Sequence, residues 1–361
     1  MNATPAPYVF HALEFSYFSA KVRPALRYKG LWVVERRPDF REIQRRTGLG
    51  FIPILVTPED ETWQDSTDIY ERLEARHPEP PLFPGTAVQR MAAHLAELYV
   101  DEFALIPAMH YRWGSELGER STRARFAAAI GNAALADASA DRMVRARALL
   151  GSTAETAPAV EAHTRDLLEA LSAHLEACPF LLGERMSFAD CALLGPLDGH
   201  FFSDLEPRRL LLESAVPVVR WLEACKVPVA EEQGEWLAED ALAPTFRRVL
   251  EVMGRDAAPV ILDTLARVEA WADENAKPGQ ELPRATGSCR SQLRGIAMER
   301  QAIGYTLWSV QRIGDAYRAL GSDERTKLDR VLAGTGWENV LAHTPRHRVS
   351  RKGFRLVFEP S

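Results

Sequence analysis

The pattern of apolar residues changes at a proline-rich segment, residues 78–87 (PEPPLFPGTA), and this change limits the folds open to the chain. Before it, short apolar stretches of strand character alternate with helical patterns, which is typical of a small α/β domain. After it, apolar residues recur at helical spacing almost to the end of the chain. We therefore interpret residues 78–87 as a linker between an α/β domain and a helical one.

The first part is predicted to be a small sheet packed against helices. The expected strands are 8–13, 31–35, 51–56 and a short one after the turn at 59–62, and the expected helices are 19–29 and 65–76. Pro53 lies inside the third strand, where proline cannot donate to a strand ladder. The sequence therefore predicts either a cis peptide bond before Pro53 or a strand that starts there.

Two further parts follow the linker, and no internal repeat is present in either. Helices are expected at 88–113, 122–150, 157–178, 187–198 and 216–229, and then at 244–253, 258–275, 290–320 and 323–332, with a closing strand at 353–359. We divide the chain into an α/β domain (1–84), an all-helical domain (85–242) and a helical extension that ends in a strand (243–361).

Charge argues against a role in binding nucleic acid or membranes. The 361 residues carry 44 basic and 50 acidic side chains, a net charge of -6. No apolar run reaches the roughly 18 residues of a membrane span, and the N-terminus lacks secretory-signal character, so we expect a cytoplasmic protein. A basic run near the C-terminus is interpreted as a solvated strand and turn, with nucleic-acid contact as the alternative; its residues are Arg346, Arg348, Arg351, Lys352 and Arg355.

Three short segments could bind a ligand. Ser16 precedes a predicted helix, whose N-terminus favours an anion. A cis Ile52-Pro53 bond would leave the backbone of Ile52 free to pair with a ligand's main chain. Ser66 and the N-terminus of the next helix could bind a carboxylate while Asp65 binds an ammonium. Taken singly, each has a plainer interpretation, as a helix cap or an edge proline.

In this order, the segments resemble the N-terminal, thioredoxin-like domain of the cytosolic glutathione transferases. The matching residues are Ser16 with Lys21-Val22-Arg23, then Ile52-Pro53-Ile54-Leu55, and then Asp65-Ser66. The resemblance implies that Ser16 activates the glutathione sulfur, and that Ile52 and Pro53 bind the cysteinyl part. It also implies that Asp65 and Ser66 hold the γ-glutamyl end.

The helical domain resembles the same family at residues 180–190 (FLLGERMSFAD). Ser187 and Asp190 form a capping box there, with a structural role only. The resemblance spans about residues 7–230, and the extension matches no feature of the family.

The cysteines bear on the subclass. The first of the four is Cys178, so no cysteine stands near position 16, and dithiol exchange is excluded. Ser16 favours a serine-type transferase, similar to the theta and zeta classes. Tyr17, Ser19 and Tyr8 remain alternatives for the group that contacts the thiolate.

The resemblance also implies a cavity for the second substrate. The helix predicted over 88–113 has an aromatic face, and the resemblance places its C-terminal part beside that pocket. Phe18, Tyr111 and Trp113 are the expected substrate contacts. His110 is interpreted as a structural histidine of the same face.

The sequence thus predicts a glutathione S-transferase with glutathione as co-substrate, no metal, and a small, mostly apolar electrophile as second substrate. The resemblance also implies a role in detoxification and allows a homodimer. Two alternatives stay open. One is a glutathione-dependent lyase, isomerase or dehalogenase on the same site. The other is a non-catalytic binding module, in which the extension fills the second-substrate cavity or docks a partner.

Overall fold

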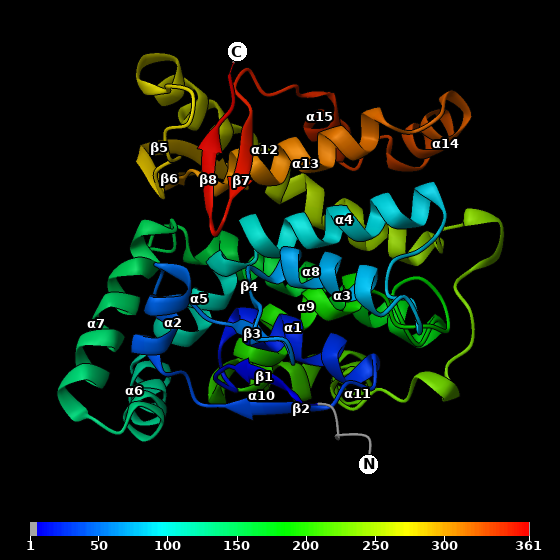
Figure 1. The fold of residues 1–361 in the computed structure, drawn as a ribbon. Coiled ribbons are helices and arrows are strands. Elements are labelled where there is room, and N and C mark those ends of the chain that lie inside the picture. Colours follow the sequence, from blue (N-terminus) through cyan, green and yellow to red (C-terminus); the bar gives the residue numbers. More distant parts are fainter. Residues whose placement is uncertain (1–5, 361) are drawn as a thin grey trace.

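The computed structural model describes residues 6–360, and its first part is a four-stranded sheet with three helices (Figure 1). The strand order is β2-β1-β3-β4; β1 is parallel to β2, and β3 is antiparallel to both of its neighbours. The elements are β1 (Tyr8–His11), α1 (Tyr17–Tyr28), β2 (Val33–Arg36), α2 (Phe40–Thr47), β3 (Ile54–Val56), β4 (Thr62–Gln64) and α3 (Ser66–Arg76). The expectation of a thioredoxin-like domain is confirmed.

The helix α2 was not expected from the sequence, which looks like an irregular polar stretch. Its side chains are largely exposed, and only Ile43 and Thr47 are buried, so the apolar period is weak. The caps define it instead: the Asp39 carboxylate accepts the backbone N–H groups of Arg41 and Glu42, and Gly48 closes the helix with a φ of 69°.

The second part is helical, as expected, but two of the predicted helices are each divided in two. The elements are α4 (Ala87–Glu102), α5 (Leu105–Trp113), α6 (Glu116–Ile130), α7 (Ala133–Leu149), α8 (Ala157–Ala177), α9 (Phe188–Pro196), a π-helical turn η1 (Leu197–Phe202), α10 (Leu205–Ser214), α11 (Val216–Lys226) and two short turns, η2 (Ala230–Glu232) and η3 (Ala238–Asp240). The helix expected over 88–113 breaks at Phe103, because the ring of Pro107 obstructs the carbonyl four residues earlier. Gly131 divides the other, with a φ of 69°.

A buried carboxylate anchors the start of α9. Asp190 Oδ2 accepts the Ser187 N–H at 2.9 Å and the Ser187 hydroxyl at 2.8 Å. Asp190 Oδ1 accepts Leu181 N–H and Trp221 Nε1–H, both at 3.0 Å. The expected capping box is present, and it ties α9 to the preceding turn and to α11.

Replacing Ser187 by Ala is expected to lower the free energy of unfolding by about 1 kcal/mol, through loss of the cap. Asp190 keeps its other three donors, so it is not left unpaired. Denaturant unfolding of the variant measures the loss, and the activity of the folded variant serves as control. A loss of activity at unchanged stability would contradict a purely structural role.

The extension is a mixed α/β segment, and here the sequence expectation is partly wrong. Residues 244–275 form one long helix in place of two. Residues 290–303, expected to be helical, belong to a β-hairpin. The closing strand is the second half of another hairpin. The elements are α12 (Pro244–Asn275), β5 (Ala285–Leu293), β6 (Ile296–Ile303), α13 (Tyr305–Arg318), α14 (Ser322–Leu332), α15 (Trp337–Ala342), β7 (Val349–Lys352) and β8 (Arg355–Phe358).

The β5–β6 hairpin follows from a two-residue period and a tight turn. Cys289, Ser291 and Leu293 are buried in alternation along β5. Arg294 and Gly295 form the turn. Both have a positive φ, of 52° and 80°, which matches the twist of the flanking strands in a two-residue hairpin loop. The helical interpretation missed this alternation because polar Ser291 occupies an inward position.

The extension shares one core with the rest of the chain. A single cluster of buried apolar residues includes members of the sheet, the helical domain, α12 and α13. Figure 1 shows the extension above α4, with the β7–β8 hairpin reaching toward the N-terminal domain. Polar contacts cross the same boundary, since Arg312 pairs with Glu97 at 2.8 Å and Glu102 accepts the hydroxyl of Ser309 at 2.7 Å. Within residues 6–360, no helix is both long and apolar enough to cross a bilayer.

Candidate active site

Strand register brings the three expected ligand-binding segments to one end of the sheet. His11 of β1 lies opposite Ile54 of β3, which lies opposite Gln64 of β4. At this row β1 ends, β3 begins and β4 ends. The loop that leads to Ser16, the Ile52–Pro53 segment and the Asp65–Ser66 pair therefore leave the sheet side by side, as antiparallel pairing requires.

Ser16 is the N-cap of α1 and is half-buried. Its hydroxyl accepts the Ser19 N–H at a long 3.4 Å. The first turn of α1 holds no acidic side chain, so nothing there opposes an anion. Gly199 of η1 lies against this loop: a Cβ there would come within 3.2 Å of the Ser16 carbonyl oxygen and 3.0 Å of Ala20 Cβ. The loop and η1 could not pack this closely around a larger residue.

The three alternative hydroxyl groups are already engaged. Tyr17 donates to the Val100 carbonyl at 2.7 Å within the core, and burial raises its pKa well above the usual value. Ser19 is fully buried. Tyr8 bonds His77 at 2.8 Å and lies at the opposite end of β1 from the site. Of the four hydroxyls, that of Ser16 is the one at this end of the sheet that is partly exposed.

The Ile52–Pro53 peptide bond is cis, as one of the two expectations had it. Within residues 6–360, the backbone N–H and C=O of Ile52 make no hydrogen bond to the protein. Gln64, which the sequence analysis missed, donates to the Phe51 carbonyl at 2.8 Å, and its Oε1 is buried without a partner in the described chain. Its position directly before the Asp65-Ser66 pair was the available signal.

Asp65 is held by its own helix and by the extension. It has a positive φ of 83°, and its Oδ1 accepts the N–H groups of Thr67 and Asp68 at 3.0 and 3.2 Å. Its Oδ2 accepts the hydroxyl of Tyr305, at the start of α13, at 2.6 Å. Arg351 of β7 lies 3.6 Å from the same oxygen. Nothing local in the sequence indicates that Tyr305 and Arg351 reach Asp65.

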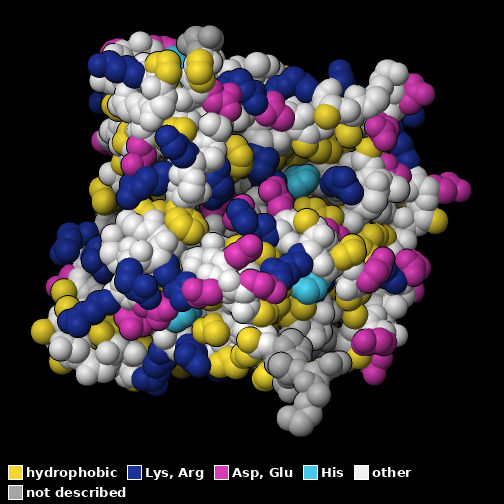
Figure 2. All heavy atoms as spheres, in the orientation of Figure 1, with side chains coloured by type: hydrophobic (Ala, Val, Ile, Leu, Met, Phe, Trp, Pro, Cys, Tyr) yellow, Lys and Arg dark blue, Asp and Glu magenta, His cyan; other side chains and the backbone are white. Residues whose placement is uncertain are grey.

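Arginines of the extension line this end of the sheet further. The Arg284 guanidinium lies 4.5 Å from the centroid of the Phe51 ring, and burial lowers its pKa. Arg355 of β8 donates to the Gly48 carbonyl at 3.3 Å. Figure 2 shows Lys and Arg side chains interspersed with Asp and Glu side chains on the face where the extension meets the N-terminal domain. Three arginines of the extension, Arg284, Arg351 and Arg355, thus approach this end of the sheet.

The expected substrate contacts divide into two kinds. Phe18 and Tyr111 are half-buried; the Phe18 ring lies 5.1 Å from that of Tyr17, and burial raises the pKa of Tyr111 to about 12. Trp113 is buried in a small cluster between α5, α6 and α7, with its ring 5.7 Å from Phe126. As packed, Trp113 presents no surface to a ligand.

Arg112, between the two expected aromatic contacts, fixes the loop that carries Ser16. Its guanidinium is buried and donates to the Phe15 carbonyl at 2.9 Å, the Gly199 carbonyl at 2.6 Å and the Asp204 carboxylate at 2.6 Å. Burial disfavours its charge and lowers its pKa despite Asp204. Arg112 thus links α5 to the entry of α1.

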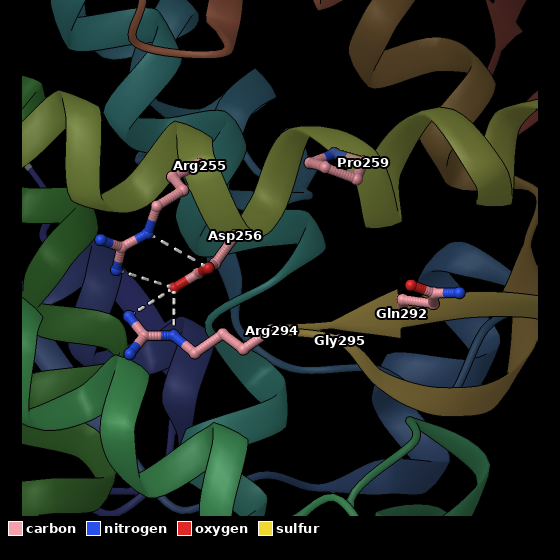
Figure 3. Close-up of a pocket in the computed structure, with 6 residues that line it drawn as sticks. All are labelled: Arg255, Asp256, Pro259, Gln292, Arg294 and Gly295. Atoms are coloured by element: carbon pink, nitrogen blue, oxygen red, sulfur yellow. Dashed lines mark hydrogen bonds and ion pairs between the residues drawn. The ribbon is translucent and has the colours of Figure 1, made fainter.

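A separate cavity of about 430 Å³ lies between α12 and the β5–β6 hairpin (Figure 3). In Figure 3, Arg255 and Arg294 point toward Asp256 from two sides. Both arginines also pair with Asp166, so two positive charges meet two negative ones. Burial would raise the pKa of Asp256, but hydrogen bonds from His163 and Arg294 outweigh it and hold the pKa below its usual range. None of the expected site residues lines this cavity, and its charges are matched.

Among the described residues, no group of His, Cys, Asp and Glu is arranged to hold a metal ion. No curated protein is significantly similar to the chain in sequence. Residues 10–81 match the family model of the glutathione S-transferase N-terminal domain, and residues 132–226 match that of the glutathione S-transferase C-terminal domain. Both models end before the extension.

Several solved structures are similar over about two-thirds of this chain. A glutathione S-transferase from Rhodospirillum rubrum F11 is 19% identical, with a TM-score of 0.42, over 67% of this chain and 91% of its own. FzlA from C. crescentus is 20% identical, with a TM-score of 0.43, over 67% and 98%. The beta-etherase LigF from Sphingobium sp. strain SYK-6 is 17% identical, with a TM-score of 0.43, over 68% and 99%.

Proposed function

We propose that this chain, whose first two parts match both domain models of the glutathione S-transferase family, binds glutathione at the end of the sheet and activates its thiol. The thiolate then attacks a small, mostly apolar electrophile. The observation that carries this proposal is the meeting of Ser16, the free backbone of Ile52, and the Asp65–Ser66 pair at one row of the sheet. These groups together suit a thiol peptide with a free amino-acid end.

Ser16 is the proposed activating residue. A free thiol with a pKa of about 8.5 is roughly 3% ionised at pH 7. Lowering that pKa by about two units takes some 2.7 kcal/mol of stabilisation that favours the thiolate, and raises the ionised fraction above roughly 70%. A hydrogen bond from the half-exposed Ser16 hydroxyl and the N-terminus of α1 can supply this amount. The proton leaves to solvent or buffer, and the electrophile's leaving group departs as the carbon–sulfur bond forms.

The cysteinyl and γ-glutamyl parts are assigned to the other two segments. The cysteinyl backbone pairs with Ile52 N–H and C=O beside Pro53, as an added strand would. The γ-glutamyl carboxylate binds Ser66 and the N-terminus of α3, and its ammonium binds Asp65.

Asp65→Ala and Ser66→Ala are each expected to raise the dissociation constant for glutathione by roughly 5-fold to 100-fold, because each removes a contact of about 1 to 3 kcal/mol. The catalytic rate at saturating glutathione should change much less. Titration calorimetry and steady-state kinetics measure the two quantities. If both variants reach half-saturation at the same glutathione concentration as wild type, the proposed binding site is contradicted.

The second substrate is proposed to lie against Phe18 and Tyr111, with the buried Trp113 supporting α5 from behind. Detoxification of electrophiles in the cytoplasm and assembly as a homodimer are the corresponding physiological proposals. Sedimentation of the purified protein tests the homodimer.

Binding without turnover is the second candidate, because the extension reaches the glutathione end of the site through Tyr305 and Arg351. Two assays on the full chain separate the candidates. A rise in melting temperature with glutathione indicates a site, and glutathione-dependent conversion of chlorodinitrobenzene indicates an enzyme. Stabilisation without conversion of this or other electrophiles favours a binding module. If glutathione neither raises the melting temperature nor supports conversion, both candidates are contradicted.

A further inference from the structure

The ion pair between Asp65 and Arg351 lies at the open edge of the candidate site. Asp65 Oδ2 and Arg351 Nη2 are 3.6 Å apart, and the two side chains are 21% and 19% exposed. The neighbouring pair of Lys21 and Glu97 is different, with a distance of 2.9 Å and exposed fractions of 0% and 1%. A separation of 3.6 Å is longer than a hydrogen bond, so the pair leaves guanidinium donors of Arg351 unused. A ligand can therefore reach the Asp65–Arg351 pair, but it cannot reach the Lys21–Glu97 pair.

Among the described residues, hydrogen-bond donors without a protein partner lie beside this ion pair. Arg351 lies 5.5 Å from the centroid of the Trp308 ring, and the Trp308 indole N–H is buried without a partner in the part of the chain that is described. The Ser66 hydroxyl and N–H, next to Asp65 at the start of α3, make no hydrogen bond within residues 6–360. These groups suit a carboxylate.

A single acceptor faces them. Asp65 Oδ1 accepts the backbone N–H groups of Thr67 and Asp68, so Oδ2 is the oxygen that remains for a ligand. The Tyr305 hydroxyl fixes that oxygen at 2.6 Å. A carboxylate oxygen has more than one lone-pair direction, so Oδ2 can accept an ammonium while it keeps Tyr305.

We propose that Arg351, which belongs to the extension, determines the specificity of this site for an amino-acid end that carries both charges. The head group inserts between Asp65 and Arg351: its α-carboxylate binds Arg351 together with Ser66, and its ammonium binds Asp65. The inference rests on the proposed function and names the group that selects the γ-glutamyl end.

The exchange conserves charge. Before binding, Asp65 and Arg351 neutralise each other; after binding, each faces the opposite charge of the ligand. A ligand that lacks its α-carboxylate would separate the pair and leave Arg351 without its ion-pair partner, facing only the carboxylates of Asp68 and Glu71, which is costly at a half-buried position. Arg351 therefore penalises ligands that carry only one of the two charges, in addition to attracting glutathione.

The test is titration calorimetry on the full chain with two peptides. One is glutathione, and the other is γ-aminobutyryl-cysteinyl-glycine, which keeps the amine but lacks the α-carboxylate. The variant is Arg351→Gln, and the matched control is Arg348→Gln. Arg348 is exposed and pairs with Asp315 at 2.6 Å, away from Asp65. Wild type should bind glutathione roughly 10-fold to 100-fold more tightly than the analogue. Arg351→Gln should lose that preference, because it weakens glutathione binding and no longer penalises the analogue, and Arg348→Gln should keep it.

Equal weakening of both peptides by Arg351→Gln would give Arg351 a merely structural role and overturn the inference. Unchanged binding of glutathione would do the same. If Arg351→Gln does not fold, the wild-type preference decides, because equal affinity for the two peptides contradicts the inference without any variant. Wild type that binds neither peptide overturns the proposed function as well, whereas wild type that binds both alike overturns only the role of Arg351.

Discussion

A chain that ends at Ala243 is expected to be insoluble, or to melt far below the full-length protein. Removing the extension uncovers the faces of α4 and α8 on which α12 packs. It also strips partners from buried charges, since Glu97 loses Arg312 and Glu102 loses Ser309. An apolar face of this size exceeds the few hundred Å² that soluble surfaces tolerate.

The magnitude follows from the residues of α12 that leave water when it packs. Fully buried apolar side chains of that helix include Phe246, Val249, Leu250, Met253, Val260, Ile261 and Leu265. At about 1.5 to 3 kcal/mol each, their burial contributes more than roughly 10 kcal/mol, which is comparable to the whole stability of a typical domain.

The measurement is the soluble yield and melting temperature of residues 1–243 beside the full chain. The matched control ends at Pro360, which removes one residue and should change neither quantity. A soluble 1–243 fragment with an undiminished melting temperature would show that the extension is an independent module.

Ser16→Ala is expected to lower the glutathione-dependent rate by roughly 10-fold to 1000-fold while glutathione affinity stays within a few-fold. The lost hydrogen bond stabilises the thiolate over the thiol, and so it acts on the reacting state more than on binding. Steady-state kinetics with chlorodinitrobenzene measure the rate, and calorimetry measures the affinity.

The matched control is Ser19→Ala, three residues along the same helix and fully buried. It should cost some stability and leave the rate of the folded enzyme unchanged. Full activity in Ser16→Ala would move the activating role to Ser19, Tyr17 or Tyr8, and their variants would then identify it.

The site segments could be predicted because each is local in sequence. A serine before a helix, a proline at the start of a strand and an acid-serine pair before another helix depend on a few neighbouring residues. The order of the strands then brings them together. Element ends were less accurate: a helix was expected to begin at Ser19, but Ser16 caps α1 three residues earlier.

The contribution of the extension could not be predicted, because it depends on packing between distant segments. Tyr305 and Asp65 are 240 residues apart in sequence. Arg351 stands in a basic run that the sequence presents as a solvated turn, and nothing local distinguishes it from Arg348 or Arg355. The helix expected over 290–320 is wrong only in its first part, 290–303, and the cause there is local: pairing between the adjacent strands β5 and β6 selected a two-residue period over a helical one.

The most direct test of the account is the ultraviolet absorbance of the thiolate of glutathione bound to the full chain, followed as a function of pH. We predict that bound glutathione ionises with an apparent pKa about two units below the free value of about 8.5, and that Ser16→Ala moves it back toward the free value. Saturating glutathione that titrates on the wild-type protein as it does in solution would contradict the proposal that this site activates the thiol.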